Sequence, residues 1–256
     1  MADDDKPTVS GPWDDLRRLT PARIGLARAG ASLATAPLLE FQLAHARARD
    51  AVHAPLDDAR LIADLAALGA GAIALASAAA ADRRTYLMRP DLGRTLAPES
   101  LPALTAQSGP CDVVFAVSDG LSAQAVQTHA APVLARVLPA LRAEGWRVGP
   151  LAVVRHGRVA IGDRIAEALR ADSVAILIGE RPGLTAPDSM GAYLTWRPSA
   201  RTTDADRNCI SNIRPDGIGY ADAAFKLLHL LRAMRAAGRS GIHLKDDSDR
   251  LLIGGG

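Results

Sequence analysis

The chain has 256 residues, of which 48% are hydrophobic and only 4% aromatic, and its formal net charge is +2 at pH 7. Basic and acidic residues are interspersed, which argues against a nucleic-acid-binding surface, and two cysteines are too few for a disulfide framework. The most apolar stretch, 68–81, is too short to span a bilayer, and the acidic start of the chain is not a secretory signal. We therefore expect a cytoplasmic protein with an aliphatic core, which binds neither nucleic acid nor membrane.

The first hundred residues are predicted to be mainly helical. Residues 1–12 are rich in Asp and Pro, which predicts a disordered tail. After a short helix and a Pro-led turn, one helix is predicted between Pro37 and Pro55 and another over 57–69. The run AIALASA then predicts a short buried strand, and the polar, Pro-punctuated residues 81–100 predict a loop.

The rest of the chain alternates between strand and helix patterns. Apolar strands are predicted in DVVFAVSDG, WRVGPLAVVRHG and SVAILIGERPG, separated by helices, and two further strand-like stretches precede a closing helix at YADAAFKLLHLLRAMRAAG. Helices between strands indicate βαβ crossovers and a parallel sheet. We expect an α/β fold with a Rossmann-like parallel sheet and flanking helices over 105–245, preceded by a helical segment over 13–104. A second disordered tail is expected over 246–256.

The stretch LIGERPGL runs from an apolar strand directly into Glu180 and Arg181, flanked by two glycines and a proline. In open α/β sheets, ligands bind outside the carboxyl ends of the strands, and glycines let the backbone approach a ligand closely. Glu180 could accept hydrogen bonds from ligand amides or hydroxyls. The alternative is that Glu180 and Arg181 form a surface ion pair on a turn.

Further candidates lie at the equivalent junctions. In SDGLSAQA, Asp119 and Ser122 could hold a polar group, or one of them could simply cap the following helix. Val159 in HGRVAIGD could form an apolar wall or be an ordinary core valine. Cys209 lies in the apolar stretch NCISNI, where a buried inert thiol is the alternative.

No metal site or catalytic constellation is predicted, because His and Cys never cluster at ligand spacing and neither GxSxG nor a Walker loop occurs. GAGAIA formally fits a dinucleotide fingerprint, which would suggest a nucleotide-dependent oxidoreductase. It follows a helix pattern and precedes a strand, the inverse of the required context, so we reject it.

Taken together, these stretches resemble one family, the small subunit of the adenosylcobalamin-dependent enzyme ethanolamine ammonia-lyase. The resemblance covers the chain from Leu16 to about Leu244. It is carried by seven stretches in order: LTPARIGLARAG, LLEFQLAHARARDAVHAPLD, ADRRTYLMRPDLGR, DVVFAVSDGLSAQAV, VVRHGRV, LIGERPGL and DADRNCISNIRPDG.

The resemblance implies an ammonia-lyase subunit that is not active alone. The family's enzyme converts ethanolamine to acetaldehyde and ammonia by a radical rearrangement, and a separate large subunit, a TIM barrel, carries the chemistry. We accordingly expect no catalytic residue here, contact of 13–104 with the large subunit, and a higher-order hetero-oligomer. The protein is expected in the cytoplasm, with packing into a bacterial microcompartment left open.

The family's cobalamin-contacting positions fall on Val159, Glu180 and Cys209, with Ile210 as the fallback for the last. Weaker candidates for the rim are the residues Asp119, Ser122 and Arg181. A base-on cofactor is expected, because Leu121 stands where the D-x-H-x-x-G motif would place a cobalt-binding histidine. The alternative function is a purely structural or solubilising subunit with no role in the cofactor site.

Overall fold

The structure is a computed structural model and describes residues 13–20, 22–26, 28–69 and 71–248. The tail expected over 1–12 therefore lies outside the described residues, as do residues 249–256 of the second expected tail. Among the described residues, no helix is both long and apolar enough to cross a membrane.

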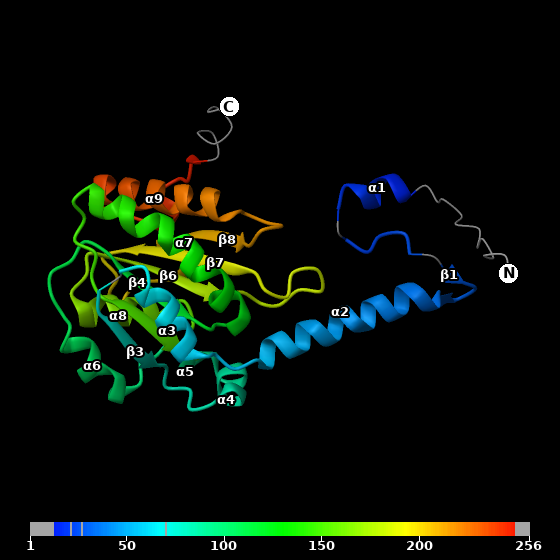
Figure 1. The fold of residues 1–256 in the computed structure, drawn as a ribbon, viewed down its shortest axis with the longest axis horizontal. Coiled ribbons are helices and arrows are strands. Elements are labelled where there is room, and N and C mark those ends of the chain that lie inside the picture. Colours follow the sequence, from blue (N-terminus) through cyan, green and yellow to red (C-terminus); the bar gives the residue numbers. More distant parts are fainter. Residues whose placement is uncertain (1–12, 21, 27, 70, 249–256) are drawn as a thin grey trace.

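An arm extends from the body of the protein at its N-terminal end (Figure 1). It consists of α1 (Asp14–Arg18), the short antiparallel pair β1 (Arg28–Ala29) and β2 (Ser32–Leu33), and the long helix α2 (Thr35–His53). The helix predicted after Pro37 is thus confirmed. It ends before Pro55 because the ring of a proline disfavours helical backbone in the residue that precedes it, and Ala54 is extended, with ψ 129°.

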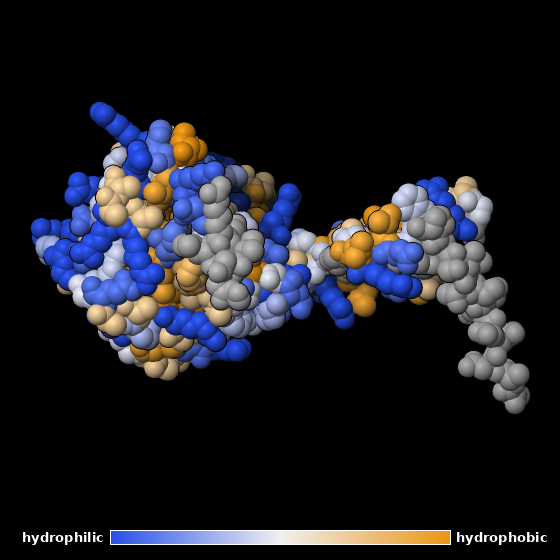
Figure 2. All heavy atoms as spheres, turned by 90° about the horizontal axis from the view of Figure 1, so that it is seen from above, coloured by the Kyte–Doolittle hydropathy of each residue, from blue (hydrophilic) through white to orange (hydrophobic). Residues whose placement is uncertain are grey.

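Apolar side chains gather on this arm (Figure 2). The large hydrophobic residues exposed on β2 and α2 are Leu33, Leu38, Leu39, Phe41 and Leu43, and Leu16 is exposed on α1. Several exposed apolar side chains gathered on one part of a protein are typical of an interaction surface.

A six-stranded sheet forms the body, in the order β3-β5-β4-β6-β7-β8. Neighbours among the first four strands are parallel, and β7 and β8 are added antiparallel at one edge. The predicted α/β fold with flanking helices is confirmed, with a mostly parallel sheet. The strands are β3 (Ile73–Ser77), β4 (Val114–Ser118), β5 (Leu151–Arg155), β6 (Ser173–Gly179), β7 (Met190–Trp196) and β8 (Arg207–Ile213).

The antiparallel edge has a simple cause in the connections. A parallel neighbour needs a crossover of a dozen or more residues, usually with a helix, whereas residues 180–189 between β6 and β7 contain no helix. Residues 197–206 between β7 and β8 contain only the short 3₁₀ helix η2 (Asp204–Asp206). Both connections therefore reverse the chain direction.

The sheet begins earlier in the chain than the expected boundary at residue 105. Strand β3 pairs with β5 along its whole length, from Ile73 opposite Leu151 onward. Helix α3 (Asp58–Ala66) buries Leu61 and Leu65 completely in the same core. The α/β body thus includes residues that we had assigned to the N-terminal segment, because the strand pattern at AIALASA supplies its edge strand.

Residues 81–100, expected as a loop, contain three short helical turns instead. Helix α4 (Arg83–Met88) is followed by α5 (Pro90–Gly93) and the 3₁₀ helix η1 (Pro98–Ser100), and α6 (Leu101–Thr105) comes next. The loop prediction was wrong because Asp82 caps α4: its carboxylate accepts the N–H of Thr85 at 2.7 Å. Prolines at the start of α5 and η1 also suit the first turn of a helix.

Helices cover both faces of the sheet. Successive side chains along a strand therefore point alternately into one of two cores, one on each face. Helices α3, α7 (Ala123–Ala143) and α9 (Tyr220–Ala237) pack on one face, where Phe115 and Val117 of β4 point. Helices α6 and α8 (Ile161–Leu169) pack on the other face, with Val114 and Ala116. Ser248, expected in the C-terminal tail, is buried against α9.

Candidate functional site

Two adjoining pockets open at the carboxyl ends of the parallel strands and along the β7–β8 edge. Their volumes are about 380 and 370 Å³, and they share the lining residues Arg158, Val159 and Tyr193. We call the two together the groove. Helix α8 packs on β6 and β4. The same face of the sheet is therefore left uncovered at β7 and β8, and the groove lies there.

The groove brings together the three positions expected to contact a cofactor. Val159 follows β5 and lines both pockets, Glu180 follows β6 and lines one, and Cys209 on β8 lines the other. Arg181 lines the same pocket as Glu180. Two of these residues follow strands β5 and β6 and the third lies within β8, so their meeting was not visible in the linear order of the chain.

Strand alternation decides between Cys209 and its fallback. Cys209 lies directly opposite Tyr193 of β7, on the groove side, and is exposed. Ile210 points to the opposite face, where it packs in the α7–α9 core and is only 2% exposed. The geometry therefore favours Cys209, and the alternative of a buried inert thiol is wrong.

Asp119 and Ser122 lie beneath the surface and line neither pocket of the groove. Ser122 is fully buried, and its hydroxyl caps α7 by accepting the N–H of Ala125 at 3.3 Å. Asp119 is 3% exposed and accepts the backbone N–H of His156 at 2.7 Å. Burial raises the pKa of Asp119, and the nearby Arg83 guanidinium opposes that shift. Both residues thus hold the strand ends in place.

The glycine that ends β6 is required by close packing. A Cβ on Gly179 would lie 2.0 Å from the carbonyl oxygen of Ser122, nearer than any real contact. Its own carbonyl accepts the N–H of Leu121 at 2.8 Å. The loop between β4 and α7 therefore passes close over the end of β6. Gly120 in this loop has a left-handed backbone, with φ +51°, which glycine adopts without strain.

Glu180 is oriented by the neighbouring edge of the sheet. Its carboxylate accepts the backbone N–H of Asn212, at the end of β8, with N···O distances of 3.1 and 3.3 Å. A Cβ on Gly191 would lie 2.9 Å from the same carboxylate, so that glycine gives it room. In the part of the chain that the structure describes, Glu180 and Arg181 form no ion pair, which leaves acceptor capacity on Glu180 for a ligand.

Several groove residues were missed by the sequence analysis, among them Tyr86, Arg158 and Tyr193. Burial raises the pKa of Tyr86 to about 12 and raises that of Tyr193 still further, so both phenols are neutral donors near pH 7. Tyr86 was hidden because its segment was expected to be a loop. Tyr193 could have been found from strand alternation opposite Cys209.

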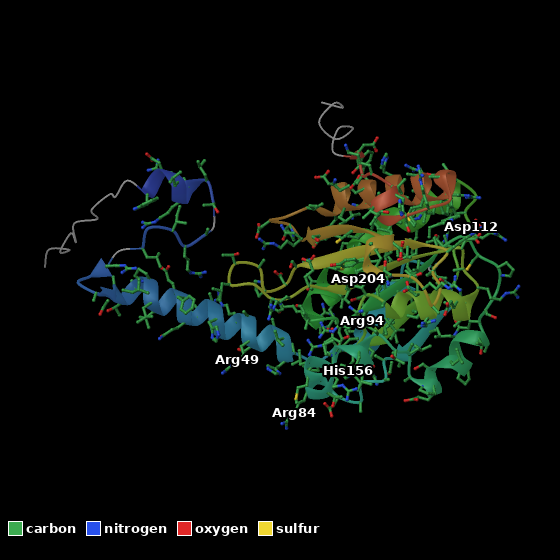
Figure 3. The ribbon with its side chains drawn as sticks, turned by 180° about the vertical axis from the view of Figure 1, so that it is seen from behind. Arg49, Arg84, Arg94, Asp112, His156 and Asp204 are labelled. Carbon is green, nitrogen blue, oxygen red and sulfur yellow. The ribbon has the colours of Figure 1, made fainter. Side chains whose placement is uncertain are left out.

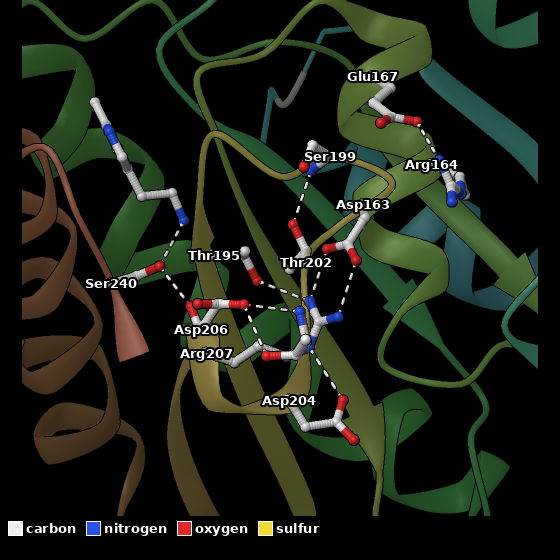
Figure 4. Close-up of polar contacts among 12 residues, drawn as sticks. Asp163, Arg164, Glu167, Thr195, Ser199, Thr202, Asp204, Asp206, Arg207 and Ser240 are labelled. Atoms are coloured by element: carbon white, nitrogen blue, oxygen red, sulfur yellow. Dashed lines mark hydrogen bonds and ion pairs between the residues drawn. The ribbon is translucent and has the colours of Figure 1, made fainter. Parts of the chain in front are cut away.

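A buried ion pair fixes the floor of the groove beside Cys209 (Figure 4). Arg207 donates to both carboxylate oxygens of Asp163 on α8, at 2.7 and 2.8 Å, and to the hydroxyl of Thr195 at 3.0 Å. Arg207 and Asp163 are almost fully buried, with 3% and 6% of their side chains exposed. This pair joins the start of β8 to α8.

One end of the groove is lined by exposed charged side chains. Arg94 and Asp204 lie near each other there, at 3.5 Å between guanidinium and carboxylate (Figure 3). A larger cavity of about 670 Å³ adjoins this end and shares Arg94 and Ala160 with it. That cavity contains none of the expected site residues, so we place the candidate site in the groove. Among the described residues, no group of three or more His, Cys, Asp or Glu side chains could hold a metal ion.

The chain is an α/β protein with a mostly parallel sheet, and its groove lies at the strand ends, where α/β proteins typically bind ligands. A model of the family described as "Ethanolamine ammonia-lyase light chain (EutC)" matches residues 10–245. The chain belongs to this family.

Curated relatives show the same similarity over nearly the whole chain. The chain is 53% identical to the ethanolamine ammonia-lyase small subunit of Ralstonia nicotianae, an alignment covering 99% of this chain and 96% of the relative. It is 52% identical to the small subunit of Azotobacter vinelandii, covering 98% and 94%, and 52% identical to that of Pseudomonas fluorescens (strain SBW25), covering 93% and 87%.

Proposed function

We propose that this chain is the small subunit of an ethanolamine ammonia-lyase and that its groove forms part of the adenosylcobalamin site, against a large subunit. The family membership and the near-complete coverage of the relatives named small subunits support the first part. A small subunit implies a larger partner chain. The reaction proposed for the assembled enzyme is conversion of ethanolamine to acetaldehyde and ammonia.

One observation carries the cofactor assignment. Val159, Glu180 and Cys209, three positions far apart in sequence, line one continuous groove. Cobalamin is a large ring fringed with amides, so it requires an apolar wall, a close backbone and hydrogen-bond acceptors. Val159 supplies the apolar wall. Gly179, which has no side chain, leaves its backbone accessible to a ligand in the groove, and Glu180 keeps a carboxylate that can accept further hydrogen bonds. The residues present therefore fit the group.

The cofactor supplies the radical chemistry when bound, and this chain holds and shields it. Leu121 lines the pocket of Glu180 where a cobalt-binding histidine would otherwise be expected, which supports a base-on cofactor. We assign no catalytic residue to this chain. Its groove residues bind and orient the cofactor and, together with the large subunit, exclude water.

The arm is proposed to contact the large subunit. Its exposed apolar side chains, among them Leu39 and Phe41, would be covered in such a contact. Assembly into a higher-order hetero-oligomer, and packing of that assembly into a microcompartment, remain predictions.

Co-expression with the matching large subunit tests the proposal. Acetaldehyde release from ethanolamine would be measured with adenosylcobalamin added, with and without this chain and with the variant Glu180→Ala. We expect turnover to require this chain and the apparent KM for the cofactor to rise in the variant. Full activity of the large subunit alone would overturn the proposal and reduce this chain to a structural or solubilising role. In that alternative, Glu180→Ala leaves the cofactor KM unchanged.

A further inference from the structure

The charges that line the groove are unequal: four arginines face two carboxylates. Arg207 is neutralised by the buried Asp163, and Arg94 lies 3.5 Å from Asp204. Arg181 is exposed, so water solvates its charge. Arg158 differs from all of these, because it is half-buried and forms no ion pair with any residue that the structure describes.

Arg158 stands at the centre of the groove, since it lines both pockets. Its backbone N–H donates to the carbonyl of Gly93 at 2.7 Å, and its guanidinium lies 4.3 Å from the centroid of the Tyr86 ring. Nη2 donates weakly to the carbonyl of Tyr86 at 3.4 Å, while Nε is buried without a hydrogen-bond partner among the described residues. The side chain is therefore held in place with donors unused.

Its supports are themselves rigid. Tyr86 is completely buried, and its hydroxyl donates to the carbonyl of Gly157 at 3.3 Å. A Cβ on Gly93 would lie 2.7 Å from Cγ of Arg158, so the glycine admits the arginine stem. The aromatic ring stabilises the cation without neutralising it. An arginine fixed in this way, with its charge uncompensated, is suited to an anion that presents two acceptor oxygens side by side, such as a carboxylate or a phosphate group.

We infer that Arg158 binds the phosphodiester in the nucleotide loop of base-on cobalamin; this inference rests on the proposed function. The side chains around the corrin ring are neutral amides, so the phosphodiester is the anionic group that this arginine could pair with. Arg158 would thereby select cobalamins with an intact nucleotide loop over truncated corrinoids that lack it.

Equilibrium dialysis on the assembled complex with the large subunit tests the inference, with visible absorbance as the readout. The probes are cyanocobalamin, cobinamide phosphate, which keeps a phosphate but lacks the ribose and base, and cobinamide, which lacks all three. The variants are Arg158→Gln and, as a matched control, Arg164→Gln on the exposed side of α8. Arg164 lies outside the groove and pairs only with Glu167 in the described structure.

Arg158→Gln is expected to weaken binding of cyanocobalamin and cobinamide phosphate by about 10- to 100-fold, the usual effect of losing hydrogen bonds to a charged group. Binding of cobinamide should change less than about twofold, and Arg164→Gln should bind all three probes as the wild type does. Equal weakening of all three probes, or no change, would overturn the phosphate assignment and leave the proposed function standing.

Two further measurements keep the outcomes distinct. If Arg158→Gln does not assemble, Arg158→Lys replaces it; this variant keeps the charge but not the planar pair of donors, so cyanocobalamin should lose more affinity than cobinamide. Equal losses in that variant contradict the inference. If the wild-type complex binds cyanocobalamin no better than the large subunit alone, the proposed function itself fails.

Discussion

The carboxylate of Glu180 and the backbone N–H of Asn212 join the ends of two strands that are not neighbours. Glu180 follows β6 and Asn212 lies near the end of β8, with β7 between them. Asn212 has a left-handed backbone, with φ +59°. The acceptor expected to meet the cofactor is thereby oriented before any ligand arrives.

Replacing Glu180 by Ala should weaken binding of adenosylcobalamin to the assembled complex by about tenfold or more, because a charged acceptor is lost. Glu180→Gln keeps one acceptor oxygen and should fall between Ala and wild type. Equilibrium dialysis measures the dissociation constants, and gel filtration checks that the subunits still associate. Equal affinity in all three proteins would show that Glu180 does not touch the cofactor.

Gly179→Ala, at the end of β6, and Gly183→Ala, in the loop that follows, form a matched pair. At Gly179 the added Cβ would meet the Ser122 carbonyl at 2.0 Å, whereas at Gly183 the nearest atoms lie at 3.7 and 3.9 Å. We expect Gly179→Ala to lower the free energy of unfolding by about 1–3 kcal/mol or more, through overpacking. Gly183→Ala should change it by less than about 0.5 kcal/mol. Urea denaturation followed by circular dichroism decides; similar midpoints would refute the packing argument.

The buried pair Arg207–Asp163 should be sensitive to removal of one partner. Asp163→Ala leaves the buried guanidinium of Arg207 with only the exposed Asp204, at 3.4 Å, as a carboxylate partner. Removing the buried partner of such a pair typically costs about 3–5 kcal/mol of unfolding free energy. The exposed pair Arg164–Glu167 on the same helix provides the control, since Glu167→Ala should cost less than about 1 kcal/mol. Chemical denaturation of the three proteins compares them. Equal losses for the two variants would mean that Asp204 or water compensates the charge of Arg207 without Asp163.

His129 should make stability depend on pH. It is 1% exposed, its Nδ1 lies 2.9 Å from the hydroxyl of Tyr220, and burial lowers its pKa below the ordinary 6.5. The unfolded chain therefore takes up this proton more readily than the folded one. The free energy of unfolding is therefore unaffected by the titration of His129 above a pH of about 6.5. It decreases as the pH falls from that value toward the lower pKa of His129 in the folded protein.

Unfolding free energies of wild type and His129→Gln, measured between pH 7.5 and pH 5.5, check this prediction (a range of about one unit either side of the ordinary histidine value). The wild type should lose more stability on acidification than the variant. Asp188, which lies 3.7 Å from Nε2, belongs to the loop that also carries Glu180 and Arg181. If the two proteins have the same pH dependence, His129 titrates as an ordinary exposed histidine.

Much of the fold could be predicted because the local patterns agree with the tertiary structure. The strand at AIALASA was recognised, as were the helix that ends before Pro55 and most of the helix predicted over 57–69, which ends at Ala66. The antiparallel edge was missed because strand direction depends on connection length and not on strand composition. The turns of 81–100 were missed because polar residues and prolines suit both loops and first helical turns.

The candidate site was only partly predictable for a related reason. Val159, Glu180 and Cys209 were named through the family resemblance, while sequence alone gave each a plausible structural alternative. Strand alternation then separated Cys209 from Ile210. Arg158 could not be singled out from the sequence. Its proposed role depends on the absence of an ion-pair partner and of a hydrogen bond to Nε among the described residues, which only the structure reveals.

The most direct test of the central claim is an experimental structure of this chain bound to the large subunit, with adenosylcobalamin present. We predict density for the cofactor in the groove, in contact with Val159, Glu180 and Cys209 and with its free face against the large subunit. A cofactor enclosed by the large subunit alone, with the groove filled by protein or water, would contradict the account.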